Sequence, residues 1–219
     1  SEAYCPEDNT LSISKLELHD FYIQKMIIRR WFEIQKMRMP SEQHLDRIMS
    51  EVISARRDSN PVFQFSNVMV RRYRKKLYLL GKLRGINTDS ILLWEHGVRS
   101  LNLENNGTLT IIKTCLPGIP RDLCQKFRVT VRYRQGGERI SLFAREGRHT
   151  LKKLFQEVGT PPWLRDRMPM IYFNNRLAAI GDTWVSSDFF RVGKGENLKF
   201  QWCFSNSLRK DHDEMDNVD

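Results

Sequence analysis

The chain has 219 residues, is 40% hydrophobic and carries a formal net charge of +10. This length allows one large domain or two small ones. No apolar run approaches the roughly 18 residues of a membrane span, so we expect no membrane partner. The polar, acidic start lacks both a signal peptide and an initial Met, which predicts a piece of a longer protein.

The four cysteines form no CxxC pair, and no His stands at ligand spacing from them. They are Cys5, Cys115, Cys124 and Cys203. This usage predicts reduced thiols in a cytoplasmic protein and no metal site.

The first part of the chain predicts helices followed by a β-meander. Residues 1–11 read as a disordered lead-in, and residues 16–35 as a helix that Met39-Pro40 ends. Ser41 is placed to cap a second helix, whose apolar residues repeat at helical spacing. Three strands follow, at Val62–Phe65, Val68–Tyr73 and residues 76–80. We expect this domain to cover residues 12–84.

A β-rich domain is predicted over residues 85–204, with an acidic disordered tail at 205–219. A hairpin is expected across Asn105-Asn106-Gly107, and another at the turn Gln135-Gly136-Gly137. The expected strands lie at residues 91–94, 101–103, 109–112, 127–133, 170–173, 177–180 and 198–204, with one short helix from Thr150 to Val158 and an exposed loop at 115–125. The fold class is therefore α+β, in two small domains, the second sandwich-like.

The positive charge is concentrated in two stretches. Residues 66–85 hold seven Lys and Arg and no acid, and residues 121–153 hold ten against three acids, so each stretch is +7. Such patches suit phosphate tracking, and nucleic acid is the commonest anionic partner of a basic chain. A merely solvated basic surface is the alternative.

The first candidate RNA-binding cluster surrounds one β-turn, which projects long side chains into solvent. It comprises Arg71, Arg72, Arg74, Lys75 and Lys76. The alternative interpretation is a charged hairpin tip that keeps a sheet edge soluble.

The second candidate cluster lies around the start of the helix at Thr150. It comprises Arg145, Arg148, His149, Lys152 and Lys153. Cations at a helix N-terminus gain nothing from the helix dipole, so a bound phosphate would explain them. Arg165 and Arg167 are further candidates, with an internal ion-pair cluster around Asp166 as the alternative.

Two groups of motifs resemble successive domains of the bacterial tRNA(Ile)-lysidine synthetases. RRWFEIQ, LDRIMSEVISARRDSNP and VMVRRYRKKLYLL are similar to the middle domain of that family. LKKLFQE, PPWLRDR and MIYFNNRLAAIG are similar to its C-terminal domain. The motifs follow the family's order and cover most of residues 18–186. At fold level, the second half also resembles a β-rich module of the phenylalanyl-tRNA synthetase β-subunit.

The resemblance implies an ATP-dependent ligase that joins lysine to the wobble cytidine of an isoleucine tRNA with a CAU anticodon. In that family an N-terminal domain with a Ser-Gly-Gly-x-Asp-Ser phosphate loop uses ATP, lysine and magnesium. No such loop, Walker motif or G-x-S-x-G elbow occurs here, so we expect no catalytic residue and no cofactor in this chain.

The function that we expect is tRNA binding on behalf of that catalytic domain. The partners would be isoleucine tRNA, the protein's own N-terminal catalytic domain and, if the family's frequent dimerisation applies, a second copy. A general structured-RNA-binding module and a protein-docking module without RNA binding are the alternatives.

Overall fold

The structure is a computed structural model that describes residues 2–56, 59–193 and 195–204. These residues form two units, which we call unit 1 (residues 2–84) and unit 2 (residues 85–204). Both combine helices with antiparallel strands, which confirms the α+β class with two small domains. No helix within the described residues is long and apolar enough to cross a membrane.

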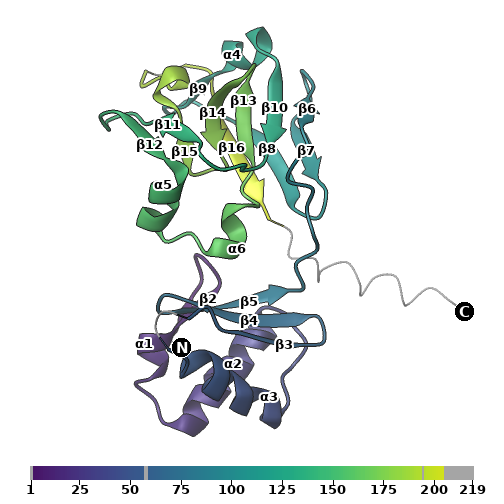
Figure 1. The fold of residues 1–219 in the computed structure, drawn as a ribbon, viewed down its shortest axis with the longest axis vertical. Coiled ribbons are helices and arrows are strands. Elements are labelled where there is room, and N and C mark those ends of the chain that lie inside the picture. Colours follow the sequence, from purple (N-terminus) through teal and green to yellow (C-terminus); the bar gives the residue numbers. More distant parts are fainter. Residues whose placement is uncertain (1, 57–58, 194, 205–219) are drawn as a thin grey trace, which may run out of the picture. The chain divides into compact units, whose positions relative to one another are not determined.

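Unit 1 is a five-stranded antiparallel sheet with helices on one face (Figure 1). The strand order is β1-β2-β5-β4-β3. The strands are β1 (Tyr4–Cys5), β2 (Thr10–Ser12), β3 (Val62–Phe65), β4 (Val68–Tyr73) and β5 (Lys76–Gly81). The helices are α1 (Ile13–Leu16), α2 (Phe21–Ile34), α3 (Glu42–Arg47) and the π-helical turn η1 (Ile48–Ile53).

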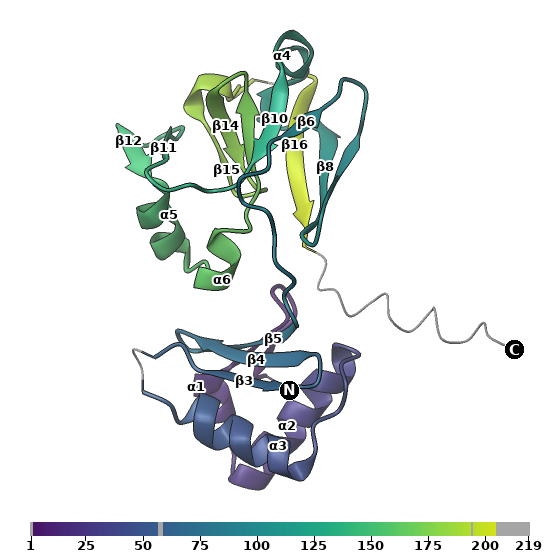
Figure 2. The same cartoon turned by 45° about the vertical axis from the view of Figure 1, so that its right-hand side comes forward.

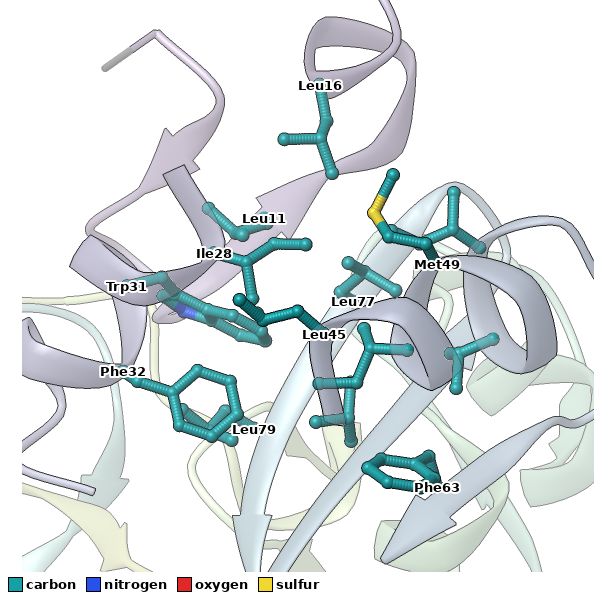
Figure 3. Packing of buried hydrophobic residues seen from close by; sticks show 14 of the residues in the cluster. Leu11, Leu16, Ile28, Trp31, Phe32, Leu45, Met49, Phe63, Leu77 and Leu79 are labelled. Carbon is teal, nitrogen blue, oxygen red and sulfur yellow. The ribbon is translucent and has the colours of Figure 1, made fainter. Parts of the chain in front are cut away.

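The core of unit 1 forms where α2 and α3 pack on the sheet (Figure 3). Trp31 and Phe32 from α2 meet Leu45 from α3 and Leu77 from β5, all at most 1% exposed. Ser41 caps α3 as expected, because its hydroxyl accepts a hydrogen bond from the His44 amide. Burying such side chains is the main contribution to the stability of a small domain.

Two expectations for the start of unit 1 differ from the structure. The lead-in is ordered from residue 2, since the Ser12 amide donates to the Ala3 carbonyl at 2.8 Å and β2 pairs with β5. The helix expected from residue 16 begins only at Phe21, because Leu16 ends α1 and the Asp20 carboxylate caps α2 by accepting from the Ile23 amide. The apolar pattern runs through both helices and hides this break.

Unit 2 is a sandwich of two antiparallel sheets with a small two-stranded ribbon (Figure 2). The sheets have the orders β15-β14-β13-β10-β6 and β7-β8-β16-β9, and the ribbon pairs β11 with β12. The strands are β6 (Leu92–Trp94), β7 (Ser100–Leu103), β8 (Gly107–Thr114), β9 (Ile119–Pro120), β10 (Val129–Arg132), β11 (Arg139–Ser141), β12 (Arg148–Thr150), β13 (Met170–Phe173), β14 (Arg176–Ile180), β15 (Trp184–Val185) and β16 (Asn197–Cys203). The helices are α4 (Arg121–Lys126), α5 (Leu151–Val158), α6 (Pro162–Arg165) and the 3-10 turn η2 (Ser187–Phe189).

The main core of unit 2 lies between its two larger sheets. Trp94, Val131 and Phe173 from one sheet pack with Leu109 and Phe200 from the other. A second, smaller cluster forms where the apolar side of α5 meets β13 and β14. The hairpin across residues 105–107 and the helix after Thr150 are both present as expected.

Two expectations for unit 2 are wrong. The segment 115–125 is not simply an exposed loop, because Gly118 pairs with Arg191, Ile119 is buried and Pro120 precedes α4. Pro120 precedes the first residue of α4, whereas Pro117 and Gly118 lead into the short strand β9. The turn at Gln135–Gly137 does not join a hairpin, because β11 pairs with β12 and not with β10. The predicted tail at 205–219 lies outside the described residues.

Candidate nucleic-acid interface

The turn between β4 and β5 displays two cations at its tip. Tyr73 pairs with Lys76, which leaves Arg74 and Lys75 as a two-residue turn, and both side chains are exposed. Arg74 has φ +56°, in the left-handed region that non-glycine residues rarely occupy. A long cationic side chain is thus kept where glycine would fit the backbone better.

The other members of the first cluster are held by the fold. The Arg72 side chain is 7% exposed and donates to the carbonyls of Ile53, at 2.7 Å, and Arg56. Lys76 forms an ion pair with Asp8, and the hydrogen bond between these two side chains raises the pKa of Lys76. Arg71 is half-buried, and burial lowers the pKa of its guanidinium. We therefore leave Arg72 out of the proposed contact surface and place Arg74 and Lys75 at its centre.

Replacing Arg74 by glycine is expected to raise the free energy of unfolding of unit 1 by roughly 0.5–1 kcal/mol. Relief of left-handed strain exceeds the entropy that glycine adds to the unfolded chain. Urea denaturation followed by far-UV circular dichroism measures the change. Lys75→Gly is the matched control and should destabilise instead, because Lys75 is not among the residues with positive φ. Equal effects of the two changes would contradict the strain argument.

The second cluster is assembled by β12 and α5, which follow each other directly. Arg148, Lys152 and Lys153 are exposed, and the two lysines stand in the first turn of α5. That turn contains no acid, and the Thr150 side chain makes no capping hydrogen bond. The positive end of the helix dipole and two ammonium groups therefore coincide, an arrangement that favours an anion.

Two predicted members of the second cluster face other parts of unit 2. Arg145 donates to the Glu157 carboxylate at 2.7 Å, which lowers the pKa of Glu157. His149 lies opposite the buried Ile140, and its Nε2 is buried. The same ribbon register places Arg139, which the residue-by-residue prediction missed, on the exposed face with Arg148. The alternation of side chains along β11 could have predicted that Arg139 is exposed, but only once the pairing of β11 with β12 is known.

The PPWLRDR motif makes several hydrogen bonds within unit 2. Arg165 donates from Nε to the Thr160 carbonyl at 2.9 Å. Arg167 is 8% exposed and donates to the Asn105 carbonyl at 3.0 Å, while its own carbonyl accepts from Asn106 Nδ2 at 2.7 Å. Asp166 is exposed, and its carboxylate accepts a hydrogen bond from Arg134 at 3.3 Å. The motif ties α6 to the β7–β8 turn, so we leave Arg167 out of the contact surface.

The remaining candidates form two exposed basic clusters. The turn cluster is Arg74 and Lys75, and the ribbon–helix cluster is Arg139, Arg148, Lys152 and Lys153. Guanidinium and ammonium groups donate hydrogen bonds to phosphate oxygens and carry fixed positive charge. These clusters can therefore bind an anionic backbone, but they supply no nucleophile or general base.

The fold and these surfaces define a two-domain α+β protein with a basic cluster on each domain. Two family models match it: "TilS substrate binding domain" over residues 11–78 and "TilS substrate C-terminal domain" over residues 129–202. The chain belongs to the tRNA(Ile)-lysidine synthetase family and carries the substrate-binding and C-terminal domains of that family.

Relatives with the name tRNA(Ile)-lysidine synthase support the same assignment. The protein from Methylococcus capsulatus is 37% identical over 82% of this chain, and that from Coxiella burnetii is 36% identical over 81%. The matched regions are 41% and 40% of those proteins, so the chain spans about two fifths of their length. The crystal structure of a TilS C-terminal domain aligns over its full length with 53% of this chain, at 21% sequence identity and a TM-score of 0.40.

Proposed function

We propose that this chain is the tRNA-binding part of a bacterial, cytoplasmic tRNA(Ile)-lysidine synthetase. It holds isoleucine tRNA with the CAU anticodon while a catalytic domain outside these residues joins lysine to the wobble cytidine with ATP and magnesium. The observation that carries the proposal is the exposed cationic cluster on each of the two matched domains.

The clusters suit recognition by shape rather than by base sequence. Stems of a folded tRNA are A-form, and side chains read their deep, narrow major groove poorly. Contacts to phosphate and ribose therefore dominate binding to such stems, and they set position and orientation. Two clusters on separate domains give two points of attachment along one RNA, which is what a positioning surface needs.

The chain's contribution to catalysis would be positional. The 219 residues contain no Ser-Gly-Gly-x-Asp-Ser phosphate loop, and the basic clusters offer only fixed donors. Holding a substrate in the reactive geometry can contribute several kcal/mol to catalysis without any reacting group in the binding domain. Lysidine formation by this chain alone, from ATP, lysine and tRNA, would contradict this division of labour.

The test is a titration of the chain with unmodified isoleucine tRNA(CAU) across a salt series. Each phosphate contact contributes about 0.7–0.9 to the slope of log affinity against log salt. We expect the pairs Arg74→Glu with Lys75→Glu, and Lys152→Glu with Lys153→Glu, each to lower the slope by about 1.5 and the affinity by about tenfold or more. Fluorescence anisotropy of labelled tRNA measures both quantities.

The same titration includes control variants and distinguishes the proposed function from its alternatives. Arg30→Glu on α2 and Lys199→Glu on β16 reverse exposed charges outside both clusters and should change affinity little. Unchanged slopes in the two cluster pairs would overturn the proposed surface. A non-cognate tRNA that binds equally well would move discrimination to the catalytic domain, and an arbitrary duplex that binds equally well would favour a general RNA-binding module.

A further inference from the structure

Unit 2 contains a pocket that neither basic cluster uses. It is lined by residues from β6 and the turn that follows it, from β8, from α4 with the start of β10, and from the start of β16. Its volume is about 600 Å³. Pockets for small molecules and single cofactor groups span about 300–1,000 Å³, so this one has room for a nucleotide.

The pocket has an apolar lining with a fixed aromatic ring. Trp94 is 3% exposed, and its indole Nε1 donates to the Val98 carbonyl at 2.8 Å, which sets the ring orientation. Ile111, Val129 and Leu198 add aliphatic surface. A planar, weakly polar group such as a nucleobase fits a lining of this kind, because its binding removes apolar surface from water.

Cys124 contributes a thiol to the lining that stays protonated at neutral pH. Burial, with a smaller contribution from Asp122, raises its pKa to about 11. A protonated thiol is a poor nucleophile. The pocket is therefore suited to reversible binding rather than to covalent chemistry.

The rim of the pocket is cationic. Arg99 and Lys113 are exposed, and they lie near each other because the Arg99 carbonyl, just before β7, accepts from the amide of Ile111, two residues before Lys113 in β8, at 2.9 Å. Arg121 also lines the pocket and is held by Glu196 at 2.8 Å. Glu95 is the one acid among the residues that line this pocket. A ligand that joins an apolar plane to a negative charge complements this arrangement.

We propose that the pocket binds one unpaired nucleotide of the RNA, with the base on the apolar lining and the phosphate at Arg99 and Lys113. The inference rests on the proposed function and adds a second kind of contact to it. The two exposed clusters would bind phosphates of a duplex stem. A base that is paired inside a stem cannot enter a pocket, so the pocket needs an unpaired one. Proteins bind single-stranded RNA by combining contacts to unpaired bases with pairing of phosphates and cations.

The test uses a 5′-phosphorylated ribotetranucleotide that carries one 4-thiouridine as the probe. Lys113→Glu reverses the charge at the rim, and Ile112→Trp fills the pocket from a half-buried position. We expect each to weaken tetranucleotide binding about tenfold or more. Lys199→Glu is the matched control, because Lys199 lies opposite Ile112 on the neighbouring strand but does not line the pocket, and it should bind like the unchanged chain.

Ultraviolet irradiation of the bound probe supplies a second readout. The cross-link should map to residues 94–99 or 111–125, and thermal unfolding confirms that each variant is folded. Cross-links elsewhere, no binding, or binding that ignores Lys113→Glu in the folded variant would overturn the pocket. If tRNA binding still responds to the cluster variants, the proposed function stands without the pocket. If only the tetranucleotide responds, the pocket stands and the cluster surface falls.

Discussion

Replacing Arg72 by alanine is expected to lower the free energy of unfolding of unit 1 by about 3 kcal/mol. The guanidinium spans the end of η1 and the segment after it, through the carbonyls of Ile53 and Arg56. Hydrogen bonds from a charged donor contribute about 1.5–3 kcal/mol each, and their loss leaves carbonyls without that donor. Arg72 therefore stabilises the packing of η1 on the sheet, and its basic neighbours in the sequence conceal this role.

Urea denaturation of the intact chain, with separate probes for the two units, measures the effect of Arg72→Ala. Arg74→Ala is the control, because it removes the same side chain two residues along, from an exposed position. It should change stability by less than about 0.5 kcal/mol. A loss of less than about 1 kcal/mol for Arg72→Ala would show that its two hydrogen bonds contribute little.

Arg167→Ala is expected to destabilise unit 2 by about 2–3 kcal/mol, without changing the RNA affinity of the folded fraction. The change removes the hydrogen bond to the Asn105 carbonyl, leaves a small cavity and takes a guanidinium from its place 5.9 Å from the Phe204 ring centroid. Burial lowers the pKa of Arg167, which marks a charge already separated from water. The side chain is thus part of the interior rather than of a binding surface.

Chemical denaturation and the tRNA titration together separate the two roles of an arginine in PPWLRDR. Lys153→Ala, an exposed change in the same unit, should show the opposite pattern, with stability kept and affinity reduced. If Arg167→Ala keeps the stability of unit 2 but weakens tRNA binding, Arg167 is a contact residue and our structural assignment is wrong.

Local patterns predicted the elements whose signals are local. Asn105-Asn106-Gly107 gives a hairpin because its residues tolerate the backbone that the turn requires, and Ser41 caps α3 with a hydroxyl that reaches the third residue of the helix. The α+β class followed from the same signals. The burial and hydrogen bonding of Arg72 and Arg167 could not be predicted from local patterns, because the carbonyls that accept from them lie 19 and 62 residues away in the sequence.

The candidate surfaces could be predicted only in outline. Charge counting found the two basic stretches, and β-turn geometry placed Arg74 and Lys75 in solvent. Arg139 was missed because β11 pairs with β12, whereas the turn at Gly136-Gly137 suggested a hairpin between the strands on either side of it. The pocket could not be foreseen at all, since its lining comes from four separated segments that only the sheet order brings together.

The position of β16 has a consequence for how the protein is made. In the order β7-β8-β16-β9, the last strand of unit 2 lies inside its sheet and pairs with β8 along its whole length. When β7 to β15 have left the ribosome, this sheet still lacks its inner strand β16. Unit 1, whose strands all precede residue 82, can complete its fold during synthesis, whereas unit 2 must wait for residues 197–203. Until then, its unpaired strand edges are the part of the nascent chain most exposed to misassembly.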